Sequence, residues 1–447
     1  MSDLLRIGAM GVSVYRNALT TVGDNVANAQ SEGYSRRDIK LRETGILGAG
    51  QPFYNDKFTV GGVRVTSIER SWDAFRAADA RLTNSDSAQS QTRLRWLNVT
   101  ETALDDGPAG IGQRLTAFYN AADALAGDPG GAAPRRAMLA ALQDVANAFH
   151  TGADGLARAA EGIATEAQTT VAAVNNELQA LADVNVAIAR SQPSGAGRAS
   201  LEDERDRLLD SLSTKIQIDY AISGKGEATV RARGTTTPNL VAGPDAGIVM
   251  LQTAADGRLS LMVTAEGSTD PLPVMAGSMA GLVDASNAVA GRRQELDALA
   301  ADFAAQLNSW SAAGTDKADN PGAAMLSGAT AAALQVVMTD PDGIAAAGGG
   351  TENGNLLALQ AQRGDTGPEA RMSNMINILA QQLASAKTQD AALTTRRDNA
   401  FAAREEVSGV DLDREAAELI RYQQAYDASS KIIQVARETL QSILAIF

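Results

Sequence analysis

The sequence predicts a mainly α fold with a small inserted β-domain, built as a long helical bundle or coiled coil in which the N- and C-terminal helices pair. Seven-residue apolar repeats at both ends and similar repeats through much of the interior are typical of packed helices. One stretch, 215–275, instead alternates as strands do. Because the first and last helices would enclose everything between them, we expect nested, discontinuous domains.

The N-terminal helix is predicted from a heptad repeat that ends near Gly33, a residue suited to a helix-ending turn. One apolar position recurs every seven residues, at Leu5, Val12, Leu19 and Val26. A second follows each of these by three, at Gly8, Tyr15, Val22 and Ala29. Two such positions per heptad form the seam of a coiled coil.

The C-terminal helix is predicted from a longer repeat, and Asp411 is expected to cap its first turn. Its seam positions are Leu412, Leu419, Tyr426, Ile433, Leu440 and Phe447. A single amphipathic helix is marginally stable in water, so each terminal helix needs a partner. The simplest partner for the first helix is the last one, and the next simplest is the same pair in a neighbouring subunit.

Further helices are predicted over 73–105, 142–188, 279–310 and 379–407, and strands near 216–222, 228–233, 248–253 and 259–263. The helix over 73–105 is expected to use Phe75, Leu82, Trp96 and Ala103 as its seam. We therefore expect a terminal polymerisation domain from 1–45 and 408–447. A helical bundle domain would comprise 46–214 and 276–407, with 215–275 as the inserted β-domain.

Composition excludes several classes of function. The chain has no cysteine and one histidine, which excludes thiolate catalysis, cysteine-zinc sites and two-histidine motifs. Its formal charge of −14, without a basic run, argues against nucleic-acid binding. No apolar run is long enough to span a membrane. Residues 1–6 lack the features of a secretory signal, so we expect a cytoplasmic chain or one that leaves by another route.

One charged run, Glu202–Arg207, is a candidate cation site, but mixed signs at helical spacing more often form a salt-bridged face. No phosphate-binding loop or nucleophile motif is present. We therefore predict no catalytic, cofactor-binding or metal-binding residues, and no cofactor.

The two ends carry motifs that identify a family. The run Gly23–Asn28 followed by Ser31–Arg36 resembles the N-terminal signature of bacterial flagellar rod, hook and hook-associated proteins, with Asp24 in place of the first asparagine. The stretch from Ser408 to Tyr426 resembles their C-terminal signature. The matching positions are Asn25, Asn28, Gly33, Tyr34, Arg36, Asp411, Leu412, Gln423 and Tyr426.

Interior motifs indicate one member of this group. The Tyr34-Ser35-Arg36 turn and the stretches 133–139, 203–209 and 353–355 are similar to the hook-associated protein 1 family. The resemblance implies a non-enzymatic axial protein that is exported by the flagellar type III route and forms the hook–filament junction outside the cell. It further implies that the protein contacts the hook protein, hook-associated protein 3, an export chaperone and copies of itself. We expect the assembly interface to comprise Leu5, Val12, Leu19, Val26, Leu412, Leu419, Tyr426, Ile433 and Leu440.

Three other interpretations stay open at this point. A flagellar hook or distal rod protein would share both end signatures, although hook proteins have mostly β middles. A soluble coiled-coil adhesin or secretion-associated binding protein would explain the heptads but not the two-ended signature. An enzyme such as a peptidoglycan hydrolase would need a catalytic constellation, and the sequence offers none.

Overall fold

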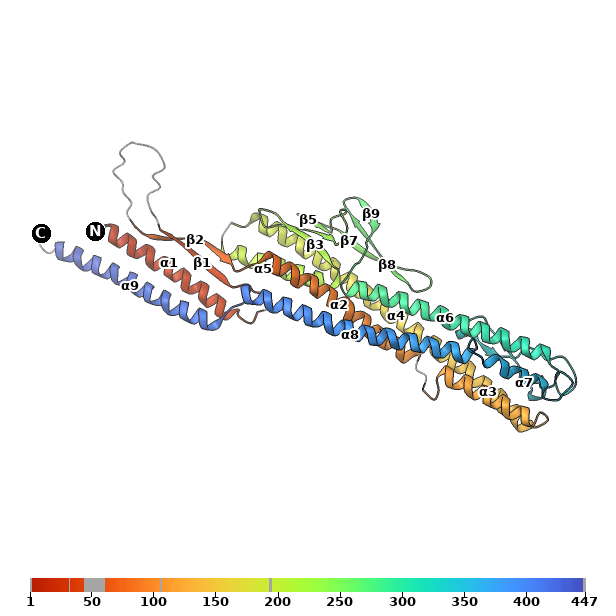
Figure 1. Ribbon diagram of the computed structural model, residues 1–447. Coiled ribbons are helices and arrows are strands. Elements are labelled where there is room, and N and C mark those ends of the chain that lie inside the picture. Colours follow the sequence, from red (N-terminus) through yellow and green to blue (C-terminus); the bar gives the residue numbers. More distant parts are fainter. Residues whose placement is uncertain (1, 32, 44–60, 105–106, 193–194, 445–447) are drawn as a thin grey trace.

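The computed structural model describes residues 2–31, 33–43, 61–104, 107–192 and 195–444, and it is elongated (Figure 1). The first and last helices lie side by side at one end, where both described chain ends also lie (Figure 1). We call α1 (Ser2–Ala27) and α9 (Leu412–Leu444) the terminal pair. We call everything from α2 to α8 the body.

The body is built mainly from long helices. Helix α4 packs against α3, α5 and α6, while α2 packs against α6 and α8. The body helices are α2 (Ala74–Ala103), α3 (Ile111–Gly127), α4 (Ala132–Arg190), α5 (Ala196–Lys215), α6 (Ser278–Ala313), α7 (Gly354–Gln360) and α8 (Pro368–Ser408). Three short 3-10 helices are η1 (Ala331–Ala333), η2 (Pro341–Gly343) and η3 (Ala361–Arg363).

The predicted seams of α4 and α6 are confirmed because their apolar positions are buried. In α4 these are Leu142, Phe149, Leu156, Ile163, Val174, Leu178, Leu181 and Ile188. In α6 they are Met279, Leu282, Val289, Leu296, Phe303 and Trp310. A heptad frame of large residues therefore locates the buried face of these two helices.

The seam predicted for α2 is confirmed only in part, since Leu82, Trp96 and Ala103 are half-buried but Phe75 is 81% exposed. The buried face of α2 includes a run of small hydroxyl residues, namely Thr83, Ser85, Ser87, Ser90 and Thr92. Helix α6 approaches this face closely at Gly281, where a Cβ atom would lie 2.6 Å from the Gln89 carbonyl oxygen. Large apolar side chains do not fit between two backbones this close, so small residues take those positions.

The inserted β-region consists of two antiparallel sheets on one side of the body (Figure 1). One sheet has the order β3 (Ile218–Ile222), β4 (Ala228–Ala232), β5 (Val241–Ala242) and β6 (Asp245–Ala246). The other has the order β7 (Ile248–Thr253), β8 (Leu259–Ala265) and β9 (Ser268–Pro271). The predicted strands are confirmed, and a short pair, β10 (Leu326–Ser327) with β11 (Gln335–Val336), lies in the loop before α7.

A hairpin that the sequence analysis did not predict lies beside the terminal pair. Its strands are β1 (Arg37–Glu43) and β2 (Val63–Arg70), which pair antiparallel with a register shift between Lys40 and Leu41. The hairpin contacts α1, and it carries the chain toward the body (Figure 1).

The apolar core is divided unevenly. One large cluster fills the body around α3 and the facing parts of α4, α6 and α8, and a second unites α4, α5 and α6 with the two sheets. The sheets thus share their core with helices. The terminal pair and hairpin have a third, much smaller cluster, whose buried members are Ala18, Val22, Ile39 and Tyr422. The domain boundaries given above stay predictions.

Within the described part of the chain, every helix is too short or too polar to cross a bilayer.

Candidate assembly site

Helices α1 and α9 run antiparallel, and small residues line their contact. A Cβ atom at Gly8 would lie 2.6 Å from Ile433 Cγ1, and one at Gly11 would lie 2.6 Å from Ser429 Oγ. Farther along, the rings of Tyr15 and Tyr422 have centroids 6.4 Å apart. The predicted pairing of first and last helices is therefore confirmed, and it relies on close backbone approach.

The seam of this contact agrees with the predicted row Gly8, Tyr15 and Val22 of α1, and differs from the other predicted row of α1 and from the row predicted for α9. Leu5, Val12 and Leu19 are half-buried and Val26 is exposed, whereas the buried positions of α1 include Gly8, Gly11, Ala18, Val22 and Asn25. On α9, Leu412 and Leu419 are exposed and Tyr426, Ile433 and Leu440 are half-buried. The buried positions of α9 are Glu415, Tyr422, Ser429 and Ala436. Phe447 lies outside the described residues.

A buried polar cluster, which we call the clasp, joins Asn25, Tyr34, Arg36 and Glu415. The Asn25 amide donates to Glu415 Oε2 (2.9 Å) and to the Arg37 carbonyl (2.9 Å). Its Oδ1 accepts from the Arg37 backbone N–H (3.0 Å) and the Tyr34 hydroxyl (2.8 Å). Both N–H groups and both lone pairs of this amide are therefore used in the clasp.

Glu415 is the acidic centre of the clasp and has no exposed surface. The Arg36 Nε donates to Glu415 Oε1 across 2.7 Å, so the buried carboxylate is both paired and hydrogen-bonded. Burial raises the pKa of Tyr34 to about 12, although the nearby Arg37 guanidinium acts to lower it. The Tyr34 hydroxyl thus stays a proton donor to Asn25 at neutral pH.

The other signature residues shape the turns around the clasp. Gly33 has a φ of +77°, which favours glycine. Asn28 donates to the Asp24 carbonyl (2.9 Å) within its own turn. Asp411 caps α9 as predicted, since its Oδ1 accepts from the Asp413 and Arg414 backbone N–H groups. Gln423 is exposed. The signature therefore describes the joint where α1 ends and α9 begins.

Among its described residues, the terminal pair leaves eight large apolar side chains exposed to solvent. We call them the apolar face, which comprises Leu4, Val26, Leu412, Leu419, Ile420, Ile432, Val435 and Ile443, each 38–56% exposed. A groove of about 410 Å³ opens on it and is lined by Leu4, Ala428, Lys431, Ile432, Val435, Ala436 and Thr439. An exposed apolar groove of this kind is a candidate interaction site.

The run Glu202–Arg207 forms a salt-bridged face. Asp203 accepts from Arg37, and Asp206 pairs with Arg70 and Arg205. No group of acidic or histidine side chains in the described ranges is arranged to hold a metal ion. The sequence did not predict the roles of Glu415, Arg37 and Arg70, because the burial of a charged residue leaves no apolar pattern in the sequence.

Comparisons with known proteins agree with this architecture. The sequence family described as the flagellar hook-associated protein FlgK helical domain matches residues 97–326, just over half of the chain. The family described as the flagellar basal body rod FlgEFG protein C-terminal region matches residues 403–446. The second match covers the end shared with rod and hook proteins, and the first favours the hook-associated family over them.

Individual relatives carry the same name. Flagellar hook-associated protein 1 of Bacillus subtilis is 25% identical over 98% of this chain and 97% of its own length. The Salmonella typhimurium protein is 26% identical over 72% of this chain and 59% of its own length, so this chain spans about six tenths of that relative. The solved structure of the flagellar hook junction protein FlgK from Burkholderia pseudomallei shares the fold, with a TM-score of 0.51 at 21% identity over 56% of this chain and 46% of that one. This chain belongs to the flagellar hook-associated protein FlgK family.

Proposed function

We propose that the chain is a structural, non-enzymatic subunit of the bacterial flagellum that forms the junction ring between hook and filament and assembles through its terminal pair. The observation that carries the proposal is the apolar face, whose side chains remain exposed to solvent. The small buried cluster of the terminal pair and hairpin does not include them. Family membership supports the place of the protein in the flagellum.

The energetics of the terminal pair favour a partner for it. The apolar cluster that it shares with the hairpin has only four buried members among the described residues, while eight large apolar side chains of the pair remain exposed. Complete burial of one such side chain contributes about 1.5–3 kcal/mol of free energy. The gain is smaller for a side chain that is already half-buried. Neighbouring copies that cover this surface with a different patch, in a head-to-tail arrangement, would produce a ring or helical array.

Among the predicted interface residues, Val26, Leu412 and Leu419 suit contact with another subunit because they are exposed. Tyr426, Ile433 and Leu440 are half-buried against α1 and serve the pairing within the chain as well. Leu5, Val12 and Leu19 are intermediate. The proposed interface thus lies beside the α1–α9 contact and continues it.

The finer parts of the proposal follow from the family resemblance. They are export by the flagellar type III route with a chaperone, an extracellular location, and contacts with the hook protein on one side and hook-associated protein 3 on the other. Electron microscopy of cells that lack the gene, with a blot for flagellin in the medium, tests them together. Bare hooks with flagellin in the medium are expected. Missing hooks would favour a hook or rod protein, and normal filaments would contradict the proposal.

A matched pair of variants tests the apolar face directly. Leu419→Asp places a charge on the apolar face, and we expect it to abolish complementation while the purified chain stays folded. Gln441→Asp introduces the same charge at an exposed polar position of the same helix and is expected to complement. Equal complementation by both variants would argue against assembly through this face.

A further inference from the structure

Three aspartates form a stripe on α5 that collects arginines from four other elements. Asp203, Asp206 and Asp210 are spaced by three and four residues, so they lie on one face of the helix. The arginines that reach them are Arg37 of β1, Arg70 of β2, Arg81 of α2 and Arg404 of α8. We call these seven residues the ladder.

Acid and base alternate along the ladder without a gap. Arg37 Nη2 donates to Asp203 Oδ2 across 2.9 Å, and Arg70 Nε lies 2.8 Å from Asp203 Oδ1 as an ion pair. The other end of the same guanidinium, Arg70 Nη2, lies 2.7 Å from Asp206 Oδ2. Arg70 therefore bridges two aspartates, which the planar fork of arginine allows and a lysine ammonium does not.

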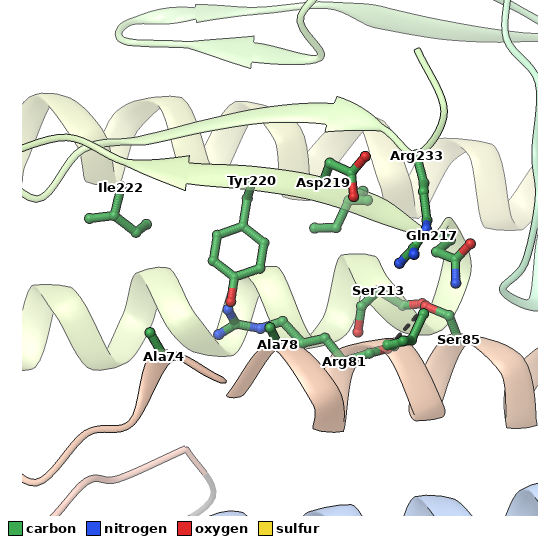
Figure 2. Close-up of a pocket in the computed structure, with 12 residues that line it drawn as sticks. Ala74, Ala78, Arg81, Ser85, Ser213, Gln217, Asp219, Tyr220, Ile222 and Arg233 are labelled. Carbon is green, nitrogen blue, oxygen red and sulfur yellow. Dashed lines mark hydrogen bonds between the residues drawn. The ribbon is translucent and has the colours of Figure 1, made fainter. Parts of the chain in front are cut away.

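The second half of the ladder repeats this arrangement. Arg81 lies 3.4 Å from Asp206 Oδ1 through Nη2 and 2.6 Å from Asp210 Oδ1 through Nε. Arg404 Nη1 completes the series, 2.7 Å from Asp210 Oδ2. Figure 2 shows the Arg81 guanidinium beneath the Tyr220 ring, whose centroid is 4.7 Å away. Arg70 and Arg81 are almost completely buried, at 5% and 4% side-chain exposure.

The ladder lies where the chain passes between the terminal pair and the body. The outgoing chain carries Arg37 and Arg70 on the hairpin, and the returning chain carries Arg404 shortly before α9. Both passages are thus fastened to one helix, α5. The Arg36 backbone N–H also donates to the Ser408 carbonyl (2.9 Å), and the Arg37 backbone bonds to Asn25 of the clasp.

We infer that the ladder fixes the direction of the terminal pair relative to the body, with Arg70 and Asp206 as its central positioning residues. Two units joined by a small, polar contact move relative to each other by default. Among the described residues, the apolar cluster of the terminal pair and hairpin contains no residue of the body, so it does not restrain the terminal pair against the body. A buried ion pair is favourable only in good geometry, and a series of them therefore selects one arrangement of the elements that carry it.

The test measures the spread of one distance in the isolated chain. Because the sequence has no cysteine, spin labels can be attached at two introduced sites, Ala189→Cys on α4 and Gln424→Cys on α9, both exposed. Pulsed electron paramagnetic resonance should give one narrow distance distribution. Arg70→Met and Asp206→Asn should broaden it at least about twofold. Arg70→Lys cannot reach both aspartates, so the width of its distribution should lie between those of the unsubstituted chain and Arg70→Met.

Glu369→Gln is the matched control, because it breaks a partly buried arginine pair elsewhere in the body and should leave the distribution unchanged. A narrow distribution in folded Arg70→Met, or a broad one in the unsubstituted chain, would overturn the inference. If Arg70→Met does not fold, Arg404→Met removes the less buried end of the ladder and is expected to broaden the distribution. The measurement needs no assembly, so its result is independent of the proposed function.

Discussion

Asn25 and Glu415 lie 390 residues apart in the sequence, yet the Asn25 amide donates to the Glu415 carboxylate across 2.9 Å. Both side chains are buried. The contact joins the end of the first helix to the start of the last one. It explains why the N-terminal signature contains Asn25, whose side chain makes this bond. Four predictions follow from this contact and from others like it in the body.

Asn25→Ala should destabilise the terminal pair by about 2–4 kcal/mol, because it leaves the Arg37 backbone and Glu415 with unmet hydrogen bonds. Hydrogen exchange of α1 and α9 amides measures the effect. Asn28→Ala is the control, since the Asn28 side chain bonds, among the described residues, to the Asp24 carbonyl of its own turn and to Ser31. Equal loss of protection in the two variants would contradict the special role of Asn25.

Gly8→Ala should weaken the α1–α9 contact by about 1–3 kcal/mol, because the added Cβ would lie 2.6 Å from Ile433. Gly23→Ala makes the same change on the same helix where no atom lies within 4 Å of the new Cβ. It should stabilise α1 by about 0.5–1 kcal/mol. Thermal unfolding followed by circular dichroism compares the two, and effects of the same sign would show that close approach is not required.

Glu369 should give the body a pH-dependent contribution to stability. Burial acts to raise the pKa of this carboxyl, but hydrogen bonds from Arg363 and Thr116 outweigh it and hold the pKa below its usual 4.5. A lowered folded-state pKa stabilises the fold above pH 4.5, and the contribution is lost as the pH falls through the folded-state value. Glu369→Gln should therefore cost about 1–2 kcal/mol at pH 7 and less at pH 3.

Urea unfolding of the parent and Glu369→Gln at both pH values measures this difference. Asp144→Asn removes an exposed ion pair with Arg114 and should change stability little at either pH. A cost for Glu369→Gln that does not shrink at low pH would mean that the ionised carboxylate is not the source of the stability.

Asn185→Ala should loosen the inserted sheets from α4. The buried Asn185 amide donates to the Ala228 carbonyl (2.8 Å) and accepts from the Ala228 backbone N–H (2.7 Å), as a neighbouring strand would. Removing it leaves both backbone groups unpaired, at a cost of about 2–4 kcal/mol. Hydrogen exchange should show lost protection in β4, whereas Asn98→Ala, whose amide bonds only to Leu94 of its own helix, should not affect that strand.

Apolar periodicity predicted the parts of the fold that bury large side chains. Leu142, Phe149 and Leu156 of α4 occupy the core where their spacing places them. The same reasoning located only part of the buried face of α2 and of the α1–α9 seam, where Ser85 and Gly11 are buried but were not selected by the heptad pattern. Small residues carry little hydrophobic signal, although they allow the closest approach of two helices.

The candidate site was predicted less completely, for an electrostatic reason. The family signature located Asn25, Tyr34 and Arg36, but Glu415 reads in sequence as a favourable charge in the first turn of an exposed helix. Its burial depends on Arg36, which arrives from the other end of the chain. The hairpin was missed as well, because charged residues dominate β1 and a register shift interrupts its alternation.

The placement of the small apolar cluster between two distant chain ends has a consequence for the order of folding. Closing a loop of 390 residues in an unfolded chain would cost about 5 kcal/mol of entropy, more than so small a cluster readily repays. Once the body has folded and the hairpin has docked on α5, however, Arg36 and Ser408 lie within hydrogen-bonding distance, and the remaining loop is short. The terminal pair should therefore form last and open first, as a late unit that the folded body nucleates.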